Sequence, residues 1–206
     1  MQFQTINPAT EEAGEAYALL TDDALQQRIA QADRTFRQWR KTAFTERSQR
    51  FYQLIERLEQ HRETYAQTIT RQMGKPIRQA RSELDKSIWV CRYYADNAAS
   101  FLSDQHRDLD TTRDSYVRFA PVGVLYVIMP WNFPFWQLFR FAAPALMAGN
   151  TLLFKHAPNV PESARHIAGL FHEAGFPEGA FQNLFIDYKQ SDQLIAHPAV
   201  QGVTLT

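Results

Sequence analysis

One asparagine of the sequence has surroundings that suit catalysis. Asn132 follows the apolar run 122–128, lies between two aromatic residues, and is bracketed by Pro130 and Pro134. The prolines restrict the backbone, and the turn falls where a parallel strand would end, at the sheet edge that binds ligands. A neutral amide donor placed there can stabilise negative charge on a carbonyl oxygen. The alternative is a turn asparagine that bonds its own backbone.

Two cations close to this segment are the next candidates. Arg140 lies in the apolar segment 135–142, where an unpaired guanidinium would be costly to bury, so we expect it to face an anion. That anion is either an internal carboxylate or a ligand. Lys155 ends the apolar run 151–155 and would lie near Asn132 if the two strands are neighbours. A lysine at a strand end can also simply reach water.

The single cysteine is a weak candidate for a nucleophile. Cys91 falls on the apolar stripe of an expected helix, so we predict a buried thiol. One cysteine excludes an internal disulfide and a multi-cysteine metal site, and we predict no metal. A hydrolase that pairs Cys91 with one of the six histidines is an alternative that thiol labelling would test. The sequence has neither a Gly-x-Gly-x-x-Gly nor a Gly-x-x-x-x-Gly-Lys motif, so a cofactor must be held by other groups.

The elements that must position these residues alternate from residue 120 onward. Four strands are expected, at residues 122–128, 151–155, 181–186 and 200–206. Helices are expected between them, at 134–147, from Pro161 towards Gly175, and after a cap at Ser191. This order is typical of an α/β fold, a Rossmann-like parallel sheet with flanking helices on both faces.

Residues 1–106 are predicted to form helices that precede the sheet. Thr21 can cap a first helix, and a second begins near Thr45. A third ends before Gly74, and Ser82 can begin a fourth. Residues 107–119 are polar, and their last part alternates as an exposed strand does, which predicts an arm.

The composition excludes several classes of partner. Lys plus Arg and Asp plus Glu both number 22, which argues against nucleic-acid binding and against a polybasic membrane-surface protein. No apolar stretch resembles a membrane span or a signal peptide. We therefore expect a soluble, cytoplasmic protein whose partners are small molecules or other subunits.

Ordered landmarks along nearly the whole chain resemble the aldehyde dehydrogenase superfamily. They are Met-Gly-Lys-Pro-Ile at 73–77, Pro-Trp-Asn-Phe-Pro at 130–134, Pro-Ala-Leu and Ala-Gly-Asn within 144–150, Lys155, and Gly-Phe-Pro-Glu-Gly at 175–179. The resemblance implies oxidation of an aldehyde to a carboxylic acid with NAD or NADP. In that family a cysteine thiolate attacks the aldehyde, hydride passes to the nicotinamide, and a glutamate-activated water hydrolyses the thioester.

The resemblance covers the N-terminal part of the family pattern. The catalytic cysteine and glutamate are expected beyond Thr206, so the fold would be a truncated aldehyde dehydrogenase fold without its catalytic domain. We therefore expect this chain alone to be inactive. The alternative is a non-catalytic dinucleotide-binding or interaction module, which titration with NAD and NADP would test.

The resemblance also implies roles for single residues. Asn132 matches the asparagine of the oxyanion hole, and Lys155 matches the lysine that hydrogen-bonds the adenosine ribose. Pro158 stands where NAD-preferring members often carry glutamate, which removes one reason to exclude NADP, and His156 could approach its phosphate. The implied cofactor-binding residues are Ile128, Met129, Trp131, Asn132, Lys155, His156, Ala157 and Pro158.

Substrate and assembly follow from the same resemblance. Arg140 matches the position where succinate semialdehyde dehydrogenases place an arginine for the distal carboxylate, and the surrounding residues resemble the bacterial NAD(P)-dependent members of that group. Phe133 and Arg140 are the expected substrate-binding residues. Residues 107–119 correspond to the family's oligomerisation arm, so we expect a homo-oligomer for the full-length enzyme.

Overall fold

A parallel sheet between two layers of helices forms the body of the molecule. The computed structural model describes residues 2–110 and 113–206. Its parallel strands are β5 (Val124–Met129), β6 (Thr151–His156), β7 (Phe181–Asn183) and β8 (Val200–Leu205), in the order β7-β6-β5-β8. The predicted α/β class and parallel sheet are therefore confirmed, with β7 three residues shorter than the apolar run that predicts it.

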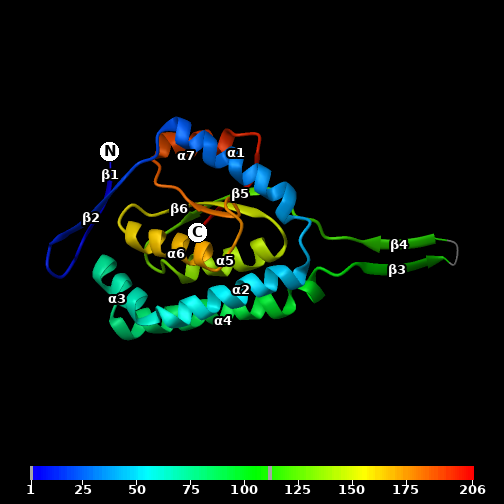
Figure 1. The fold of residues 1–206 in the computed structure, drawn as a ribbon, viewed down its shortest axis with the longest axis horizontal. Coiled ribbons are helices and arrows are strands. Elements are labelled where there is room, and N and C mark those ends of the chain that lie inside the picture. Colours follow the sequence, from blue (N-terminus) through cyan, green and yellow to red (C-terminus); the bar gives the residue numbers. More distant parts are fainter. Residues whose placement is uncertain (1, 111–112) are drawn as a thin grey trace.

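Helices α1 (Asp22–Trp39) and α7 (Tyr188–Ala196) cover one face of the sheet (Figure 1). Thr21 caps α1 by accepting a hydrogen bond from the backbone N–H of Ala24, as predicted. The prediction that Ser191 caps α7 is wrong. Asp187 is the cap and Gln190 completes a capping box, while Ser191 is buried inside the helix and bonded to the hydroxyl of Tyr126.

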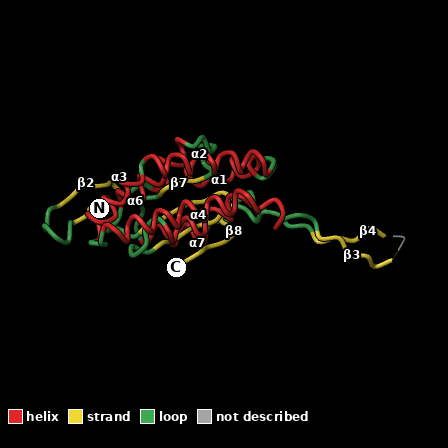
Figure 2. The backbone as a smooth tube through the Cα atoms, turned by 90° about the horizontal axis from the view of Figure 1, so that it is seen from below, coloured by secondary structure: helices red, strands yellow, loops and turns green. Residues whose placement is uncertain are grey.

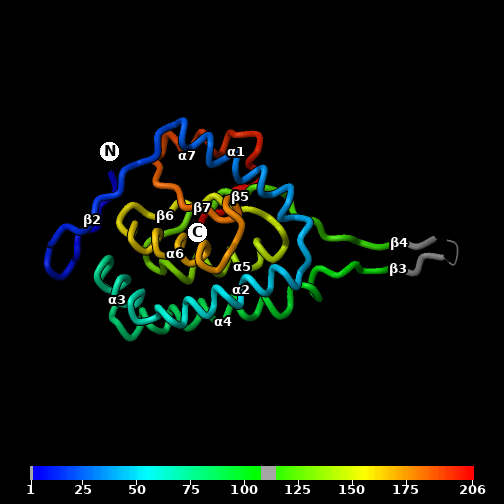
Figure 3. Tube along the Cα trace, viewed as in Figure 1, coloured from blue at the N-terminus to red at the C-terminus, as the bar shows by residue number. Residues whose placement is uncertain are grey.

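The other face carries the larger core. Helices α5 (Trp136–Met147) and α6 (Pro161–Glu173) pack on the sheet, and α2 (Phe44–Gln60), α3 (Arg62–Met73) and α4 (Ile77–Phe101) lie beyond them. The trace in Figure 3 passes from α1 to this second layer before it enters the sheet.

The fourth helix begins earlier than the sequence pattern suggests. Gly74 ends α3 in the left-handed conformation, and Pro76 is already the residue before α4. A restricted backbone at Pro76 favours immediate re-entry into a helix, so Ser82 lies within α4 instead of starting it. The apolar stripe of α4, including Cys91, is buried as predicted.

Two antiparallel hairpins extend from opposite ends of the body (Figures 1 and 2). Strands β3 (Gln105–Asp110) and β4 (Arg113–Val117) form the expected arm, of which residues 111–112 lie outside the described residues. Strands β1 (Gln2–Ile6) and β2 (Ala13–Ala18) form a hairpin that the sequence did not predict. Within the described residues, no helix has the length and apolarity required to cross a membrane.

Candidate active site

The turn that carries Asn132 lies at the carboxyl edge of the sheet. It connects β5 to α5, and the side chains of Trp131, Asn132 and Phe133 are exposed there. Strands β5 and β6 are neighbours, with Ile128 opposite Lys155 in the register. Because the two strands are neighbours, the prediction that Asn132 and Lys155 lie at one edge of the sheet is confirmed.

His156 supports this turn from beneath. Its Nε2 lies 3.0 Å from the carbonyl oxygen of Pro134, and the backbone N–H of Ala157 donates to its Nδ1 at 3.0 Å. The proton is therefore on Nε2, which donates to Pro134. Burial lowers the pKa of His156 to about 4, so the ring is neutral. The expectation that this imidazole approaches a cofactor phosphate is wrong, because the ring points into the core.

A buried ion pair holds the turn from the helix side. Lys75 donates from Nζ to Glu83, and the side chains of both residues are almost fully buried. The other carboxylate oxygen of Glu83 accepts from the backbone N–H groups of Phe135 at 2.8 Å and Trp136 at 3.2 Å. The carboxylate thus satisfies and stabilises the N-terminus of α5.

Lys75 contacts the turn directly as well. Its Nζ lies 3.8 Å from the ring centre of Phe133, a cation–π contact in a desolvated position. Sequence reasoning gave Lys75 only a place in the Met-Gly-Lys-Pro-Ile landmark and gave Glu83 no role. Lys75 lies in the connection before α4 and Glu83 lies within α4, so no helical periodicity pairs them. Charged residues within an apolar pattern are nevertheless a usable signal.

Beside Phe133, a cavity of about 360 Å³ opens between α4 and α5. Phe133 and Trp136 are among its walls, and Lys86 lies on its rim. The Nζ of Lys86 is 4.1 Å from a ring centre of Trp136. Gln137 also lines the cavity, and its Oε1 is buried without a hydrogen-bond partner among the described residues. Gln79, Ser82 and Glu83 complete the lining. The cavity therefore combines two aromatic walls with polar side chains, among them one cation and one free acceptor.

Arg140 lies one helical turn beyond Trp136 and is exposed. Of the two anions considered for Arg140, an internal carboxylate is not its partner among the described residues, and the expected burial of the guanidinium is wrong. Leu138, Phe139 and Ala142 carry the buried face of α5, and Arg140 falls on the solvent side of that helix. Helix α5 contains no acidic residue, and no ion pair of Arg140 exists in the described part of the chain.

A second cavity, of about 420 Å³, lies where β6 ends. Lys155 and Pro158 line it, together with Phe3 of β1 and the start of α7 at Tyr188 and Lys189. The Lys155 side chain is buried, and desolvation lowers its pKa. Sequence reasoning did not place Phe3, Tyr188 or Lys189 at this cavity, because it did not predict β1 and placed the start of α7 too late.

Cys91 is fully buried, as predicted, and burial raises the pKa of its thiol. A buried neutral thiol is unsuited to nucleophilic attack. In the described residues no group of histidine, cysteine and acidic side chains could hold a metal ion.

The comparisons with known proteins agree with the landmarks of the sequence. The family model described as the aldehyde dehydrogenase family matches residues 1–206. The chain belongs to this family. It is 45% identical to a protein named probable succinate-semialdehyde dehydrogenase [NADP(+)] of Synechocystis sp. over 206 residues, all of this chain and 45% of that protein.

Further relatives support the same assignment of this aldehyde dehydrogenase chain. A succinate-semialdehyde dehydrogenase [NADP(+)] 1 of Mycobacterium ulcerans is 41% identical, over all of this chain and 46% of that protein. The crystal structure of succinic semialdehyde dehydrogenase from Streptococcus pyogenes in complex with NADP+ is similar with a TM-score of 0.93 and 35% identity, over 98% of this chain and 44% of that chain. The chain thus spans less than half the length of these relatives and matches the N-terminal part of the family.

Proposed function

We propose that this chain supplies the cofactor-binding part and the oxyanion-hole asparagine of an NADP-dependent dehydrogenase for an aldehyde that bears a carboxylate, of the succinate semialdehyde class. The observation that carries the proposal is the Asn132 turn, held by Glu83 and His156 and placed beside a cavity with a cationic rim. The names of the relatives support both the substrate and the cofactor.

Asn132 acts in this proposal as a hydrogen-bond donor. Its exposed amide donates to the carbonyl oxygen of the aldehyde as negative charge develops there. The turn is fixed before substrate arrives, because the carboxylate of Glu83 and the ring of His156 hold the backbone at positions 134–136. The nucleophilic cysteine and the general base come from the C-terminal part that the relatives possess. Cys91 does not replace that nucleophile, so the 206 residues alone are inactive.

Lys86 and Arg140 attract the substrate carboxylate. The acidic neighbours of Lys86 are engaged elsewhere, since Glu83 pairs with Lys75 and Asp85 pairs with Arg62 at 2.5 Å. Lys86 is therefore free to bind an anion at the cavity rim, and Arg140 adds a second positive charge one turn further along α5. Phe133 and Trp136 offer apolar surface to the methylene groups of the substrate.

The dinucleotide lies in the proposal along the edge formed by the ends of β5 and β6. A bound nicotinamide cofactor supplies the hydride acceptor. The residues present fit such a group, since Lys155 holds a buried ammonium with no hydrogen bond to a described residue, beside a cavity of suitable size. The segment from Ile128 to Trp131 borders the same edge, and Ala157 and Pro158 follow it.

The β3–β4 arm joins subunits in this proposal. Tyr116 and Val117 near its base are exposed apolar residues, as is Phe119, and both outer edges of the hairpin lack partner strands within the described residues. Exposed strand edges pair readily with another chain. Homo-oligomer formation through this arm is the corresponding expectation for the full-length enzyme.

Steady-state kinetics with two aldehydes of equal carbon number test the proposal. The enzyme that contains this chain together with its C-terminal part is assayed with NADP and either succinate semialdehyde or butanal. Lys86→Met and Arg140→Met should each lower kcat/KM for succinate semialdehyde by about 10-fold or more, because each removes a charge-assisted contact. Activity with butanal should stay within about twofold.

Lys41→Met is the matched control, because Lys41 is an exposed lysine in the connection between α1 and α2. It should change neither substrate's kinetics. Equal losses with both aldehydes in the Lys86 and Arg140 variants would contradict the proposed carboxylate recognition, and an enzyme that oxidises neither aldehyde would contradict the proposed activity.

A further inference from the structure

A cavity at the outer edge of strand β7 has no part in the proposed function. It measures about 240 Å³ and opens between α1 and α6, where residues 176–179 lead into β7. None of its lining residues lines the cavity beside Phe133 or the cavity at the end of β6. The cavity is therefore a candidate for a ligand of its own.

Two arginines reach this cavity from opposite faces of the sheet. Arg28 belongs to α1, which covers one face, and Arg165 belongs to α6, which covers the other (Figure 1). Arg28 is exposed and forms no ion pair within the described residues, and its Nη1 donates to Gln182 at 3.3 Å. Because a guanidinium has five N–H donors, most of those of Arg28 remain available to an anion.

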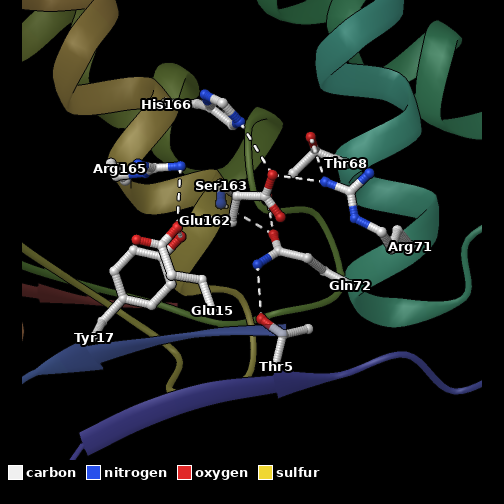
Figure 4. A network of polar contacts seen from close by, with 10 residues as sticks. All are labelled: Thr5, Glu15, Tyr17, Thr68, Arg71, Gln72, Glu162, Ser163, Arg165 and His166. Atoms are coloured by element: carbon white, nitrogen blue, oxygen red, sulfur yellow. Dashed lines mark hydrogen bonds and ion pairs between the residues drawn. The ribbon is translucent and has the colours of Figure 1, made fainter. Parts of the chain in front are cut away.

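Arg165 is held in place while part of its guanidinium stays accessible. Its Nη2 lies 3.3 Å from a carboxylate oxygen of Glu15, and its Cζ lies 5.6 Å from the ring centre of Tyr17 (Figure 4). The side chains of Arg165 and Glu15 are 53% and 58% exposed, so water weakens this pair. The two contacts orient the guanidinium, and its other N–H groups can bind a second anionic group.

Strand β7 supplies further donors to the same cavity. It lies at one end of the strand order, and no strand pairs with its outer edge in the described part of the chain. The carbonyl oxygen of Ala180 accepts from β6, and the N–H of Leu184 donates to β6. The residues that alternate with them, Phe181 and Asn183, therefore direct their N–H groups outward. Unpaired N–H groups of an edge strand bind acceptors readily.

The rest of the lining is largely aromatic. The rings of Phe171, Phe176 and Phe181 line the cavity, and all three residues are buried. Glu178 is the one acidic residue of the lining, against two arginines. Apolar surface beside two guanidinium groups suits methylene groups that join two carboxylates.

We propose that this cavity binds a small dicarboxylate of the size of succinate, with one carboxylate at Arg28 and the other at Arg165. A guanidinium fork binds a carboxylate through two parallel N–H donors. Two such forks on opposite sides of a sheet edge favour a ligand with an anionic group at each end. The inference does not rest on the proposed function, although the class includes the product of the proposed reaction.

Calorimetric titration of the 206-residue chain with succinate, butyrate and inorganic phosphate tests the inference. Butyrate has the carbon number of succinate but one carboxylate, and phosphate carries its charge at one centre. Succinate should bind at least about 10-fold more tightly than either, because only succinate contacts both arginines. Arg28→Met and Arg165→Met should each weaken succinate binding by about 10-fold or more and remove its advantage over butyrate.

Two controls and one gain of affinity accompany these variants. Arg34→Met is the matched control, because Arg34 is an exposed arginine of α1 outside this lining, and it should leave the affinity for succinate unchanged. Lys86→Met should leave it unchanged as well, which separates this cavity from the carboxylate site of the proposed function. Glu178→Gln should strengthen binding about two- to fivefold, a gain that impaired folding cannot produce.

Several results would overturn the inference. Equal affinity for succinate and butyrate would remove the second carboxylate contact, and tighter binding of phosphate than of succinate would indicate an anion with a single charged centre. Succinate binding that survives both arginine variants but is lost in Lys86→Met would place the dicarboxylate at the cavity of the proposed function. Unfolding temperatures of all variants are measured on the same samples.

Discussion

The Asn132 turn and the β1–β2 hairpin are both held by charged side chains, but in different surroundings. Beneath the turn, the side chains of Lys75 and Glu83 are 6% and 0% exposed. The hairpin rests on the network in Figure 4, where Arg71 pairs with Glu162 at 2.6 Å and their side chains are 50% and 23% exposed. The ion pair of the turn thus lies in the core, and that of the hairpin network lies near water.

The hairpin network also uses neutral groups. Gln72 donates to the hydroxyl of Thr5 at 3.0 Å and accepts from the hydroxyl of Ser163 at 2.6 Å. Arg165 of α6 reaches Glu15 of β2 at 3.3 Å. Buried neutral hydrogen bonds and partly exposed ion pairs attach the hairpin, whereas a buried ion pair fixes the turn. The two regions therefore differ in whether their charged groups are buried.

Of the changes that test this comparison in the isolated chain, Glu83→Gln should lower the free energy of unfolding most. The variant keeps the shape of the side chain but leaves the ammonium of Lys75 buried without an opposite charge. Loss of one partner of a buried pair typically lowers the free energy of unfolding by about 3–5 kcal/mol. Glu162→Gln is the matched change in the hairpin network and should lower it by less, about 1–2 kcal/mol, because the Arg71 side chain is half exposed and water weakens the contribution that the lowered pKa of Glu162 indicates.

Urea denaturation of the 206-residue chain followed by circular dichroism measures both variants under one set of conditions. Similar losses in the two variants would show that burial does not separate the two regions. A loss in Glu162→Gln larger than that in Glu83→Gln would reverse the comparison.

The pH dependence of stability should separate the two regions a second time. The pKa of His156 falls from its ordinary value of 6.5 to about 4 in the folded chain. Between about pH 6.5 and 4, His156 is therefore protonated in the unfolded chain but still neutral in the folded chain. The free energy of unfolding declines across this range, by about 3 kcal/mol at most.

The carboxylate of Glu162 contributes to stability over a lower pH range. Its contacts with His166 and Arg71 lower its pKa from 4.5 to about 2, so its contribution is present above pH 4.5 and is lost as the pH falls towards 2. Denaturation midpoints from pH 8 to 2 measure both pH ranges. His156→Gln should remove the pH dependence of stability between pH 6.5 and 4 and leave that below pH 4.5. An unchanged pH dependence between pH 6.5 and 4 in that variant would contradict its assignment to His156.

The sequence predicted the features that depend on local pattern and chain order. The apolar runs before Asn132 and at Lys155 predicted two strands, and the alternation with helices placed both residues at one edge. Thr21 and Gly74 gave correct helix boundaries because caps are local signals. Asp187 and Gln190 form an equally local capping box. The start of α7 could therefore have been predicted from the sequence, although Ser191 was predicted as its cap.

Features that depend on distant contacts were not predictable in this way. The pairing of Lys75 with Glu83 requires the path of the connection between α3 and α4, and the position of Lys189 beside Lys155 requires the packing of α7 on the sheet. His156 was assigned to the ligand because it follows Lys155, yet neighbouring residues of a strand point to opposite faces. Arg140 was expected to be buried because its neighbours are apolar, and helical periodicity placed it on the exposed side.

Mutation of Asn132 is the most direct test of the account's central claim that the rigidly held turn is half of an oxyanion hole. In the enzyme that contains this chain with its C-terminal part, Asn132→Ala should lower kcat with NADP and succinate semialdehyde by about 100- to 1,000-fold. The unfolding temperature should be unchanged. Asn97→Ala removes a half-buried amide that donates to the carbonyl of Tyr93, and it should leave kcat unaltered. A kcat of Asn132→Ala equal to that of the unmodified enzyme would contradict the claim.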